Sequence, residues 1–289
     1  MIKICFVGLG SIGQRHIKNV VNELKKRNQD FSIDAIRHSD KVLPQEINEL
    51  LNNQYYSFDE IAFDYDVIFV TNPTVDHFDT ISKALCHTKH LFIEKPVFYK
   101  HQNDMNSLNL KNDGVYYVAC PMRYDAVLEN IKGIIKEKDV ISVRAISSSY
   151  LPNWRKGVDY RNNYSAKKEM GGGVTLDLIH EIDYITWLFG MPQKCINVSG
   201  KYSNLEISSD DISVYILVYE NMLAEVHLDY IGRETVRNIE ILCNDCKVVG
   251  DFINKTLYIV NDDGLKTNFC VDQTENYILE MKNFCDMLT

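Results

Sequence analysis

Three glycines near the start of the chain have the spacing of a phosphate-binding turn. The segment Gly8-Leu9-Gly10-Ser11-Ile12-Gly13 follows an apolar run and precedes a helical pattern. In such a turn the first glycine permits a tight bend, the second lets a pyrophosphate approach the backbone, and the third lets helix and strand pack closely. Because the positive end of the helix dipole would face the phosphates, the sequence predicts dinucleotide binding by Gly8, Gly10, Ser11, Ile12 and Gly13.

The end of the second predicted strand, residues 32–37, bears on the choice of dinucleotide. A carboxylate there would accept hydrogen bonds from the adenosine ribose and repel a 2′-phosphate. This chain instead has Arg37-His38-Ser39, with Asp34 inside the strand and Asp40 beyond its end. Arg37 can pair with a 2′-phosphate and Ser39 can donate to it. We therefore expect NADP(H) to be favoured; the alternative is NAD(H), with Arg37 an ordinary charge at a strand end.

Two further polar segments follow predicted strands, where ligands bind in parallel sheets. Thr71-Asn72-Pro73, with His77 one turn later, is expected to flank the nicotinamide part of the cofactor. Glu94-Lys95-Pro96 is expected to hold a lysine near the same edge, because the residue before a proline is restricted to extended backbone. Without a ligand, the first segment would be a turn and helix start, and the second a surface Lys–Glu pair.

A glycine-rich segment, Gly171-Gly172-Gly173, opens a predicted helix that Gly190 ends. At 100° per residue, one face of this helix carries Asp177, His180, Glu181 and Tyr184, and the other carries Val174, Leu178, Ile179, Ile182 and Ile185. A histidine one turn from a carboxylate is suited to acid–base chemistry, although a single histidine is more often structural.

The elements that would position these residues divide the chain in two. Strands and helices alternate through residues 1–121, which predicts a doubly wound parallel α/β sheet, with elements at 2–7, 12–27, 32–37, 44–52, 67–71, 77–86, 90–93 and 115–119. Residues 122–289 predict an α+β domain with a mostly antiparallel open sheet, because apolar and polar residues alternate at 140–150, 196–202, 212–219, 223–230, 239–242, 247–252 and 257–260. Its exposed face could include Tyr215, Val226, Leu228 and Tyr230 and serve as an oligomer surface; the alternative is that these side chains face the core.

Composition excludes several classes of protein. With 31 basic and 40 acidic side chains the net charge is −9, so nucleic acid and anionic membranes are not expected partners. The absence of a leader pattern and of an 18-residue apolar run predicts a cytoplasmic protein. We interpret the eight cysteines as structural thiols, and Cys243-Asn244-Asp245-Cys246 as a turn, since no second pair or nearby histidine completes a metal site.

Taken together, these segments resemble the Gfo/Idh/MocA family of NAD(P)-dependent oxidoreductases, in particular members from bacterial surface-sugar biosynthesis. The resemblance spans essentially the whole chain and rests on the glycine turn with Gln14-Arg15-His16, Asn72-Pro73 with His77, Glu94-Lys95-Pro96, Arg123, and the helix bearing His180 and Asp183. It implies an N-terminal Rossmann domain and a C-terminal domain whose open sheet forms a homodimer or homotetramer. Family members usually continue beyond the helix predicted at 277–288, which suggests a shortened or truncated member.

The resemblance also implies roles for individual residues. Lys95 would be the active-site lysine and His180 the proton-transferring histidine, both touching substrate, with Glu94 and Lys95 beside the cofactor. The family's aspartate four residues before the histidine is Leu176 here, and Asp177 stands three before it, which leaves its role open. Aromatic faces and arginine would suit a pyranose ring carrying a carboxylate or phosphate, so the expected substrate contacts further include Arg123, Trp154, Arg155, Tyr160 and Tyr164; a packed loop is the alternative for residues 151–164.

The expected reaction is reversible hydride transfer between the nicotinamide and a secondary alcohol carbon of a sugar or sugar nucleotide. One alternative is a nucleotide-sensing subunit without catalysis. Another is a family member that uses its bound cofactor transiently, for elimination or epimerisation.

Overall fold

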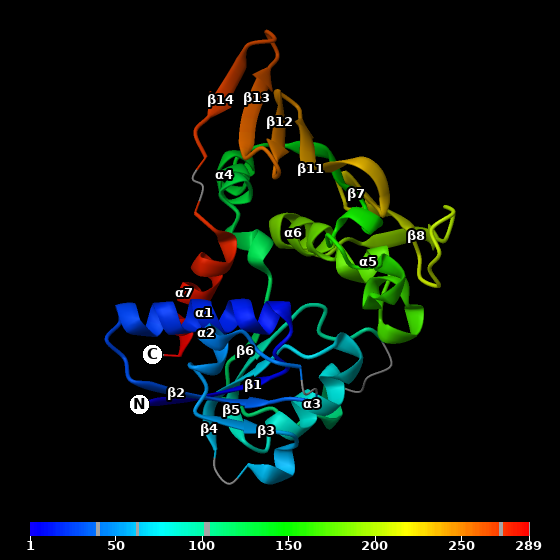
Figure 1. Ribbon diagram of the computed structural model, residues 1–289. Coiled ribbons are helices and arrows are strands. Elements are labelled where there is room, and N and C mark those ends of the chain that lie inside the picture. The colour runs from blue at the N-terminus through cyan, green and yellow to red at the C-terminus, as the bar shows by residue number, and fades with distance from the viewer. Residues whose placement is uncertain (39–40, 62–63, 101–104, 272–273, 289) are drawn as a thin grey trace. The chain divides into compact units, whose positions relative to one another are not determined.

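The computed structural model describes residues 1–38, 41–61, 64–100, 105–271 and 274–288, in two compact units (Figure 1). The first unit comprises Met1–Ala119 together with Tyr277–Thr289, and the second comprises Cys120–Asn276. Within the described residues, no helix is both long and apolar enough to cross a membrane.

The first unit is built on a six-stranded parallel sheet in the order β3-β2-β1-β4-β5-β6. Its strands are β1 (Ile2–Val7), β2 (Phe31–Ile36), β3 (Asn53–Tyr55), β4 (Tyr65–Val70), β5 (Thr88–Ile93) and β6 (Tyr116–Val118). Its helices are α1 (Ser11–Lys26), α2 (Gln45–Asn48), α3 (His77–Ala84), most of α7 (Asn276–Met287), and the short 3-10 turns Phe58–Glu60, Thr74–Asp76 and Met105–Ser107. This order, with β1 at the centre, confirms the predicted doubly wound sheet.

Both faces of this sheet are buried, because successive residues of a strand point to opposite sides. Ile4 and Phe6 of β1 belong to a core cluster with α1 and α7, whereas Cys5 and Val7 belong to a cluster with Ile81 of α3. The carboxyl-terminal halves of the central strands β1 and β4 are accordingly continuous apolar runs.

The last helix belongs to the first unit, whereas the sequence-based division assigned residues 122–289 to one domain. The Phe284 ring centroid lies 5.0 Å from that of Phe92 and 5.7 Å from that of Phe69, both on the parallel sheet. Arg27 at the end of α1 donates to the Lys282 carbonyl at 3.1 Å and to the Asp286 carboxylate at 2.6 Å. The apolar stripe of α7 is therefore covered by the parallel sheet and α1.

The second unit contains an eight-stranded sheet in the order β14-β13-β12-β11-β7-β10-β9-β8, antiparallel except for the pair β7 and β10. Its strands are β7 (Val140–Tyr150), β8 (Lys194–Gly200), β9 (Ile212–Val218), β10 (Leu223–Asp229), β11 (Ile231–Cys243), β12 (Cys246–Asp251), β13 (Thr256–Asn261) and β14 (Lys266–Phe269). Its helices are α4 (Ala126–Ile135), α5 (Val174–Asp177) and α6 (His180–Phe189), with 3-10 turns at Pro121–Tyr124, Leu151–Asn153, Tyr160–Asn162, Tyr164–Ala166 and Lys168–Met170.

One face of this second sheet is covered by helices and the other is open. Val226, Leu228 and Tyr230 are fully buried in the helix-covered core, and Tyr215 packs against it. The core-facing alternative is therefore correct for these residues, because the register places the intervening side chains on the opposite face. Along the β8–β9 edge that open face is apolar, with Ile196 opposite Ile216 and Val198 opposite Val214.

We predict that Phe284→Ala lowers the free energy of unfolding of the first unit by about 3–5 kcal/mol, because the cavity would lie against two aromatic rings of the sheet. Ile278→Ala is the matched control on the same helix, since Ile278 is 39% exposed and should cost well under 1 kcal/mol. Urea unfolding measures both. Equal losses in the two variants would contradict the burial of α7 on this sheet.

Candidate active site

Three strands of the first sheet end side by side, which places the predicted ligand-binding segments on one edge. Val7 of β1 lies opposite Val70 of β4, and Val70 lies opposite Ile93 of β5. The residues that follow are held across the edge, since Thr71 N–H donates to the Val7 carbonyl and Glu94 N–H to the Val70 carbonyl, both at 3.0 Å. The glycine turn, the Thr71–Asn72 segment and the Glu94–Lys95 segment therefore begin from adjacent positions.

The three glycines of the turn differ in what surrounds them. Gly8 has φ +90°, and a Cβ there would lie 2.7 Å from the Asn72 Cα. A Cβ on Gly13 would lie 2.5 Å from the Gly8 carbonyl oxygen. A Cβ on Gly10 would meet no atom of the described chain within 4 Å, leaving aside its neighbours and helix backbone. Gly8 and Gly13 are thus required for packing, whereas the space beside Gly10 is open.

The N-terminus of α1 suits a pyrophosphate. Gly10 occupies the N-cap and provides no side-chain cap, and the described first turn carries no acidic residue. The N–H groups of Ser11 to Gly13 precede the first intrahelical bond, from Gln14 N–H to the Gly10 carbonyl at 3.0 Å. Backbone donors and the positive end of a 16-residue helix are therefore available at this N-terminus, next to the open space beside Gly10.

At the predicted adenosine end, the structure places Arg37 just after β2, where its guanidinium donates to the Gln54 side chain at 2.7 Å and to the Lys41 carbonyl. Asp34 is buried and accepts hydrogen bonds from Asn53 N–H at 3.0 Å and from the Tyr65 hydroxyl at 2.8 Å. Its carboxylate therefore links β2 to β3 and β4. The other predicted ligand of a 2′-phosphate, Ser39, lies outside the described residues.

The side chains predicted after β4 brace the loops of this edge. The Thr71 hydroxyl donates to the Gly8 carbonyl at 2.6 Å, and the Asn72 amide donates to the Thr80 hydroxyl at 2.8 Å. Pro73 precedes the turn that leads into α3. The buried His77 ring lies between two backbone carbonyls, 3.0 Å from that of Asn72 and 3.1 Å from that of Val97. Burial lowers the pKa of His77. Because its ring lies between carbonyls of the two segments, His77 joins the loop after β4 to the loop after β5.

Lys95 follows directly on a buried carboxylate. The Glu94 carboxylate accepts the Lys95 backbone N–H at 3.1 Å and lies 2.5 Å from Nε2 of His16 on α1. Lys95 itself is half-buried. The main chain of the candidate lysine is therefore attached to the helix that begins at the glycine turn.

In the second unit, the predicted single helix after the three glycines is interrupted. Helix α5 ends at Asp177, Leu178 has φ −101° and ψ 31°, and α6 begins at His180. The Glu181 N–H accordingly bonds to the carbonyl three residues earlier, at 3.4 Å. The residues of the predicted polar face are nevertheless all buried, with Asp177 and His180 each 8% exposed and Glu181 and Tyr184 fully buried. Val174, Leu178 and Ile185 of the apolar face are buried as well.

Tyrosine hydroxyls hold the Asp177 carboxylate. The Tyr230 hydroxyl, from the residue just after β10, donates to it at 2.5 Å, and Tyr164 also hydrogen-bonds to it. Burial first, and then the charge of Asp177, raises the pKa of both tyrosines, so both remain donors. Sequence reasoning missed Tyr230 as a site residue, because it lies 53 positions from Asp177 and no local pattern joins the two.

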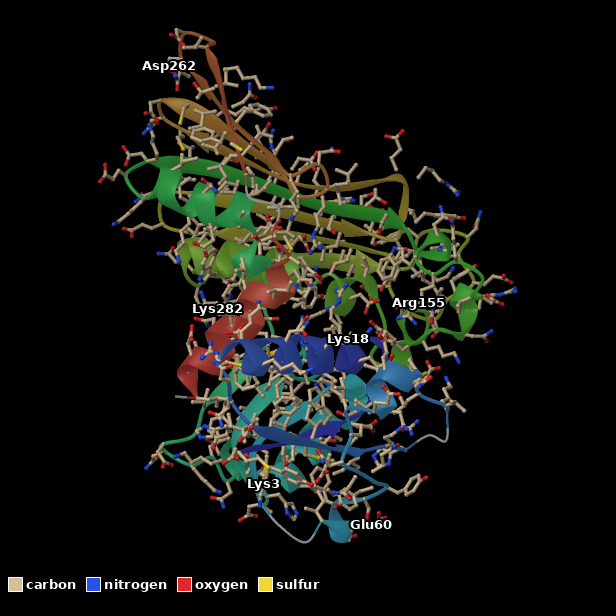
Figure 2. All side chains as sticks on the ribbon, turned by 60° about the vertical axis from the view of Figure 1, so that its left-hand side comes forward. Lys3, Lys18, Glu60, Arg155, Asp262 and Lys282 are labelled. Carbon is tan, nitrogen blue, oxygen red and sulfur yellow. The ribbon has the colours of Figure 1, made fainter. Side chains whose placement is uncertain are left out.

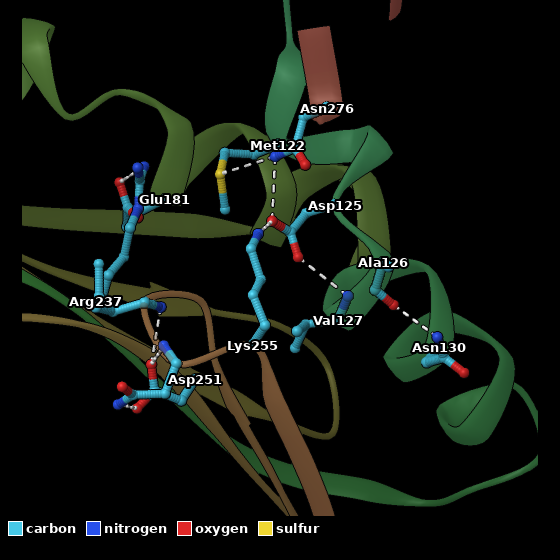
Figure 3. Close-up of polar contacts among 12 residues, drawn as sticks. Met122, Asp125, Ala126, Val127, Asn130, Glu181, Arg237, Asp251, Lys255 and Asn276 are labelled. Atoms are coloured by element: carbon cyan, nitrogen blue, oxygen red, sulfur yellow. Dashed lines mark hydrogen bonds and ion pairs between the residues drawn. The ribbon is translucent and has the colours of Figure 1, made fainter. Parts of the chain in front are cut away.

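Two carboxylates of α6 are neutralised by arginines. The buried Glu181 accepts from Nε of Arg237 on β11 at 2.7 Å, an ion pair that Figure 3 shows. Asp183 accepts two bonds from Arg123, at 3.0 and 2.5 Å. Arg123, a predicted substrate contact, therefore forms a bidentate pair with the aspartate of its own unit.

A third buried carboxylate, Asp125, ties together the ends of the second unit (Figure 3). It caps α4 through Val127 N–H at 3.0 Å, accepts from the Asn276 amide at 3.1 Å, and contacts the Lys255 ammonium. The points where the chain enters and leaves this unit are thereby held against the same carboxylate.

The loop after β7 brings some of the predicted substrate residues together. The Trp154 ring packs edge-on against the Tyr230 ring, with 5.1 Å between the ring centroids. Tyr230 and Tyr164 both hydrogen-bond to Asp177. Arg155, labelled in Figure 2, donates to Asn163 at 2.9 Å. The Tyr160 hydroxyl accepts from Glu206 N–H at 3.1 Å. Trp154 and Tyr164 therefore adjoin the Asp177 site, whereas the polar atoms of Tyr160 and Arg155 stabilise the loop.

Comparison with known proteins gives matches across both units. Residues 2–118 match the oxidoreductase family described as having an NAD-binding Rossmann fold, and residues 128–249 match the GFO/IDH/MocA C-terminal domain. An uncharacterised oxidoreductase of Bacillus subtilis is 24% identical over 230 residues, which are 74% of this chain and 63% of the relative. The chain thus spans less than two thirds of the curated relatives it matches first.

Solved structures of sugar dehydrogenases share the fold. UDP-N-acetylglucosamine 3-dehydrogenase from Acidithiobacillus ferrooxidans superposes with a TM-score of 0.75 at 17% identity, covering 99% of this chain and 88% of that one. Levoglucosan dehydrogenase in complex with NADH and levoglucosan gives a TM-score of 0.81 at 15% identity, covering 98% and 88%. At these identities the similarity establishes the fold.

We predict that Tyr230→Phe lowers the free energy of unfolding of the second unit by about 1–3 kcal/mol, because a buried carboxylate loses a charge-assisted donor. Tyr215→Phe on β9 is the matched control and should change it by less than about 0.5 kcal/mol. Denaturant unfolding at neutral pH measures both. If the Tyr230 variant is as stable as the control, the hydroxyl does not support Asp177.

Proposed function

The chain belongs to the Gfo/Idh/MocA family of oxidoreductases with an NAD-binding Rossmann fold, and we propose that it transfers a hydride between a nicotinamide dinucleotide and a secondary alcohol carbon of a sugar or sugar nucleotide. The observation that carries this proposal is the open space beside Gly10, at the N-terminus of α1, on the same sheet edge as Lys95. The first unit binds the dinucleotide, and the second binds the substrate.

When bound, the dinucleotide supplies the acceptor or donor of the hydride. A ring nitrogen of His180 takes the hydroxyl proton as the alcohol carbon is oxidised. The Lys95 ammonium stabilises the negative charge that develops on that oxygen. Asp177 is held in place by Tyr230 and Tyr164, which supports a role for its carboxyl group in orienting or electrostatically tuning the catalytic pair.

The proposed cofactor is NADP(H) in preference to NAD(H). Arg37 follows β2 directly, and the nearest preceding carboxylate, Asp34, is buried in bonds to β3 and β4. Among the described residues, the Arg37 guanidinium donates to an amide oxygen and a backbone carbonyl, and a guanidinium at this position favours a 2′-phosphate.

The proposed substrate is a sugar or sugar nucleotide. The partly exposed Trp154 and Tyr164 present aromatic surface beside the Asp177 site, and aromatic faces suit the apolar side of a pyranose. The named activities of the two structural neighbours support this class. We further propose that the chain forms a homodimer or homotetramer through the open face of the second sheet, where Ile196, Val198 and Leu223 are exposed.

We predict that Arg37→Asp shifts the ratio of kcat/KM for NADPH over NADH by at least about 10-fold toward NADH, because the new carboxylate would repel a 2′-phosphate and accept from ribose hydroxyls. Lys18→Asp, which makes the same change of charge on the exposed face of α1, should leave the ratio unaltered. Steady-state kinetics with both cofactors provides the measurement. A ratio unchanged by Arg37→Asp would contradict the assignment.

We predict that Lys95→Ala and His180→Ala each lower kcat by about 100-fold or more, while the Kd for NADPH changes by less than about 3-fold. Turnover is followed by the nicotinamide absorbance with a panel that includes UDP-N-acetylglucosamine and levoglucosan. The matched controls are Lys89→Ala, an exposed lysine of the same sheet, and His227→Ala on β10.

The outcomes of this experiment distinguish hydride transfer from the alternative functions. Turnover that is lost only in the Lys95 and His180 variants supports the proposal. NADPH binding without turnover on any substrate would instead indicate a nucleotide-sensing subunit. Product formation without net change in the cofactor would indicate elimination or epimerisation. Unchanged turnover in either variant would contradict its role.

A further inference from the structure

The contact between His16 and Glu94 joins two buried ionisable side chains at the carboxyl edge of the parallel sheet. His16 is fully buried and Glu94 is 7% exposed, and Nε2 of the imidazole lies 2.5 Å from Oε1 of the carboxylate. The two residues come from α1 and from the end of β5. The pair therefore joins a helix to a strand end.

The surroundings of His16 are aromatic. Its ring lies 4.7 Å from that of Phe92, edge-on, and 6.0 Å from that of Tyr277 on α7. Nδ1 of His16 has no hydrogen-bond partner among the described residues. An imidazole with a carboxylate acceptor at one nitrogen and no acceptor at the other carries its proton on the nitrogen facing the carboxylate. His16 is thus the donor, and Glu94 the acceptor.

The other oxygen of the same carboxylate is bonded to the candidate lysine. Oε2 of Glu94 accepts the Lys95 backbone N–H at 3.1 Å, while Oε1 faces His16. One carboxylate therefore connects the main chain of Lys95 to α1. A rotation of the Glu94 side chain would break both bonds together, so His16 determines where the Lys95 backbone lies.

The same helix begins at the glycine turn. His16 stands one turn after Gly13, whose absent Cβ allows α1 to pack against the Gly8 carbonyl and Thr71. Any ligand that orders the N-terminus of α1 would also order His16, because residues one turn apart on a helix move together. The Glu94 carboxylate would pass this ordering on to Lys95.

We propose that His16 is a positioning residue that, through the Glu94 carboxylate, couples occupancy of the Gly8–Gly13 turn to the placement of Lys95. The expected effect on turnover rests on the proposed function, because it requires that Lys95 is catalytic. The coupling itself involves only residues of the first unit. It assigns to Glu94 the task of holding the lysine backbone, in addition to the cofactor contact expected from the sequence.

The direct test is hydrogen exchange at the Lys95 amide, with and without NADPH as the probe. In the unaltered protein we expect slow exchange that NADPH slows by a further factor of at least about 3, because the amide is bonded to a carboxylate that α1 holds in place. His16→Gln keeps an N–H donor near the position of Nε2 and should retain this response. His16→Leu should speed exchange by about 10-fold or more and abolish the response.

A second variant separates positioning from stability, because His16→Leu leaves a carboxylate buried without its donor and can unfold the unit. The double variant His16→Leu, Glu94→Met replaces the pair with apolar side chains of similar size, a change that proteins often tolerate. It should unfold at a temperature close to that of the unaltered protein, and yet lose both the slow exchange of Lys95 and its response to NADPH. Val20→Ala, on the same buried face of α1, is the control that destabilises without touching the pair.

Measuring turnover of the same variants provides a second test. In the double variant kcat, measured at saturating NADPH, should fall by at least about 10-fold, whereas His16→Gln should recover most of kcat and Val20→Ala should retain it. A folded double variant that keeps slow, NADPH-responsive exchange at Lys95 would overturn the coupling. If exchange behaves as expected but Lys95→Ala still turns over substrate, the coupling stands and the proposed catalytic role of Lys95 fails.

Discussion

The close approach of two backbone segments at the carboxyl edge of the parallel sheet is the constraint on which the candidate site depends. Gly8 lies so near Asn72 that a Cβ would stand 2.7 Å from the Asn72 Cα, and Gly13 lies equally tightly against the Gly8 carbonyl. Because both positions exclude any side chain, α1 starts immediately behind the ends of β1 and β4. Its first N–H groups, which precede the intrahelical bonds, then lie next to the space that Gly10 leaves open. The Thr71 hydroxyl and the His77 ring complete this edge by bonding to backbone carbonyls, so that a ligand would meet a preformed surface.

The second unit achieves a similar rigidity with buried charges. Asp177, Glu181 and Asp125 are all almost completely buried, and each is held by donors from a distant part of the chain: Tyr230, Arg237, and Asn276 with Lys255. An isolated buried carboxylate is costly, whereas one with its hydrogen bonds satisfied fixes the elements that supply the donors. The interrupted helix that carries Asp177 and His180 is thus anchored to the sheet at several points. This arrangement suits a proton-transferring histidine whose orientation must not vary.

Local patterns predicted the elements that carry the site better than they predicted its contacts. The first strand and the helix after the glycines lie where periodicity and the glycine spacing placed them, and the parallel topology is confirmed. The short polar edge strands β3 and β14 were missed because they lack an apolar run, and β11 extends to Ile231 through a charged stretch that hides its alternation. The periodicity of α7 indicated a helix but not that Phe284 packs on the parallel sheet. The pairings of Asp177 with Tyr230 and of His16 with Glu94 join residues far apart in the chain, and no spacing rule contains that information.

The central claim is that the open space beside Gly10 receives the phosphates of a dinucleotide, and calorimetric titration of Gly10→Val with NADPH tests it most directly. Leaving aside its chain neighbours and helix backbone, the new Cβ would meet no atom of the described chain within 4 Å, so we expect the fold to be retained with a nearly unchanged unfolding midpoint. The account predicts that the Kd for NADPH rises by at least about 100-fold, because the branched side chain would occupy the place of the pyrophosphate. Gly133→Val on α4, where a Cβ is equally unobstructed, should leave the Kd unaltered. A Gly10→Val protein that is folded and binds NADPH as tightly as the unaltered chain would contradict the account.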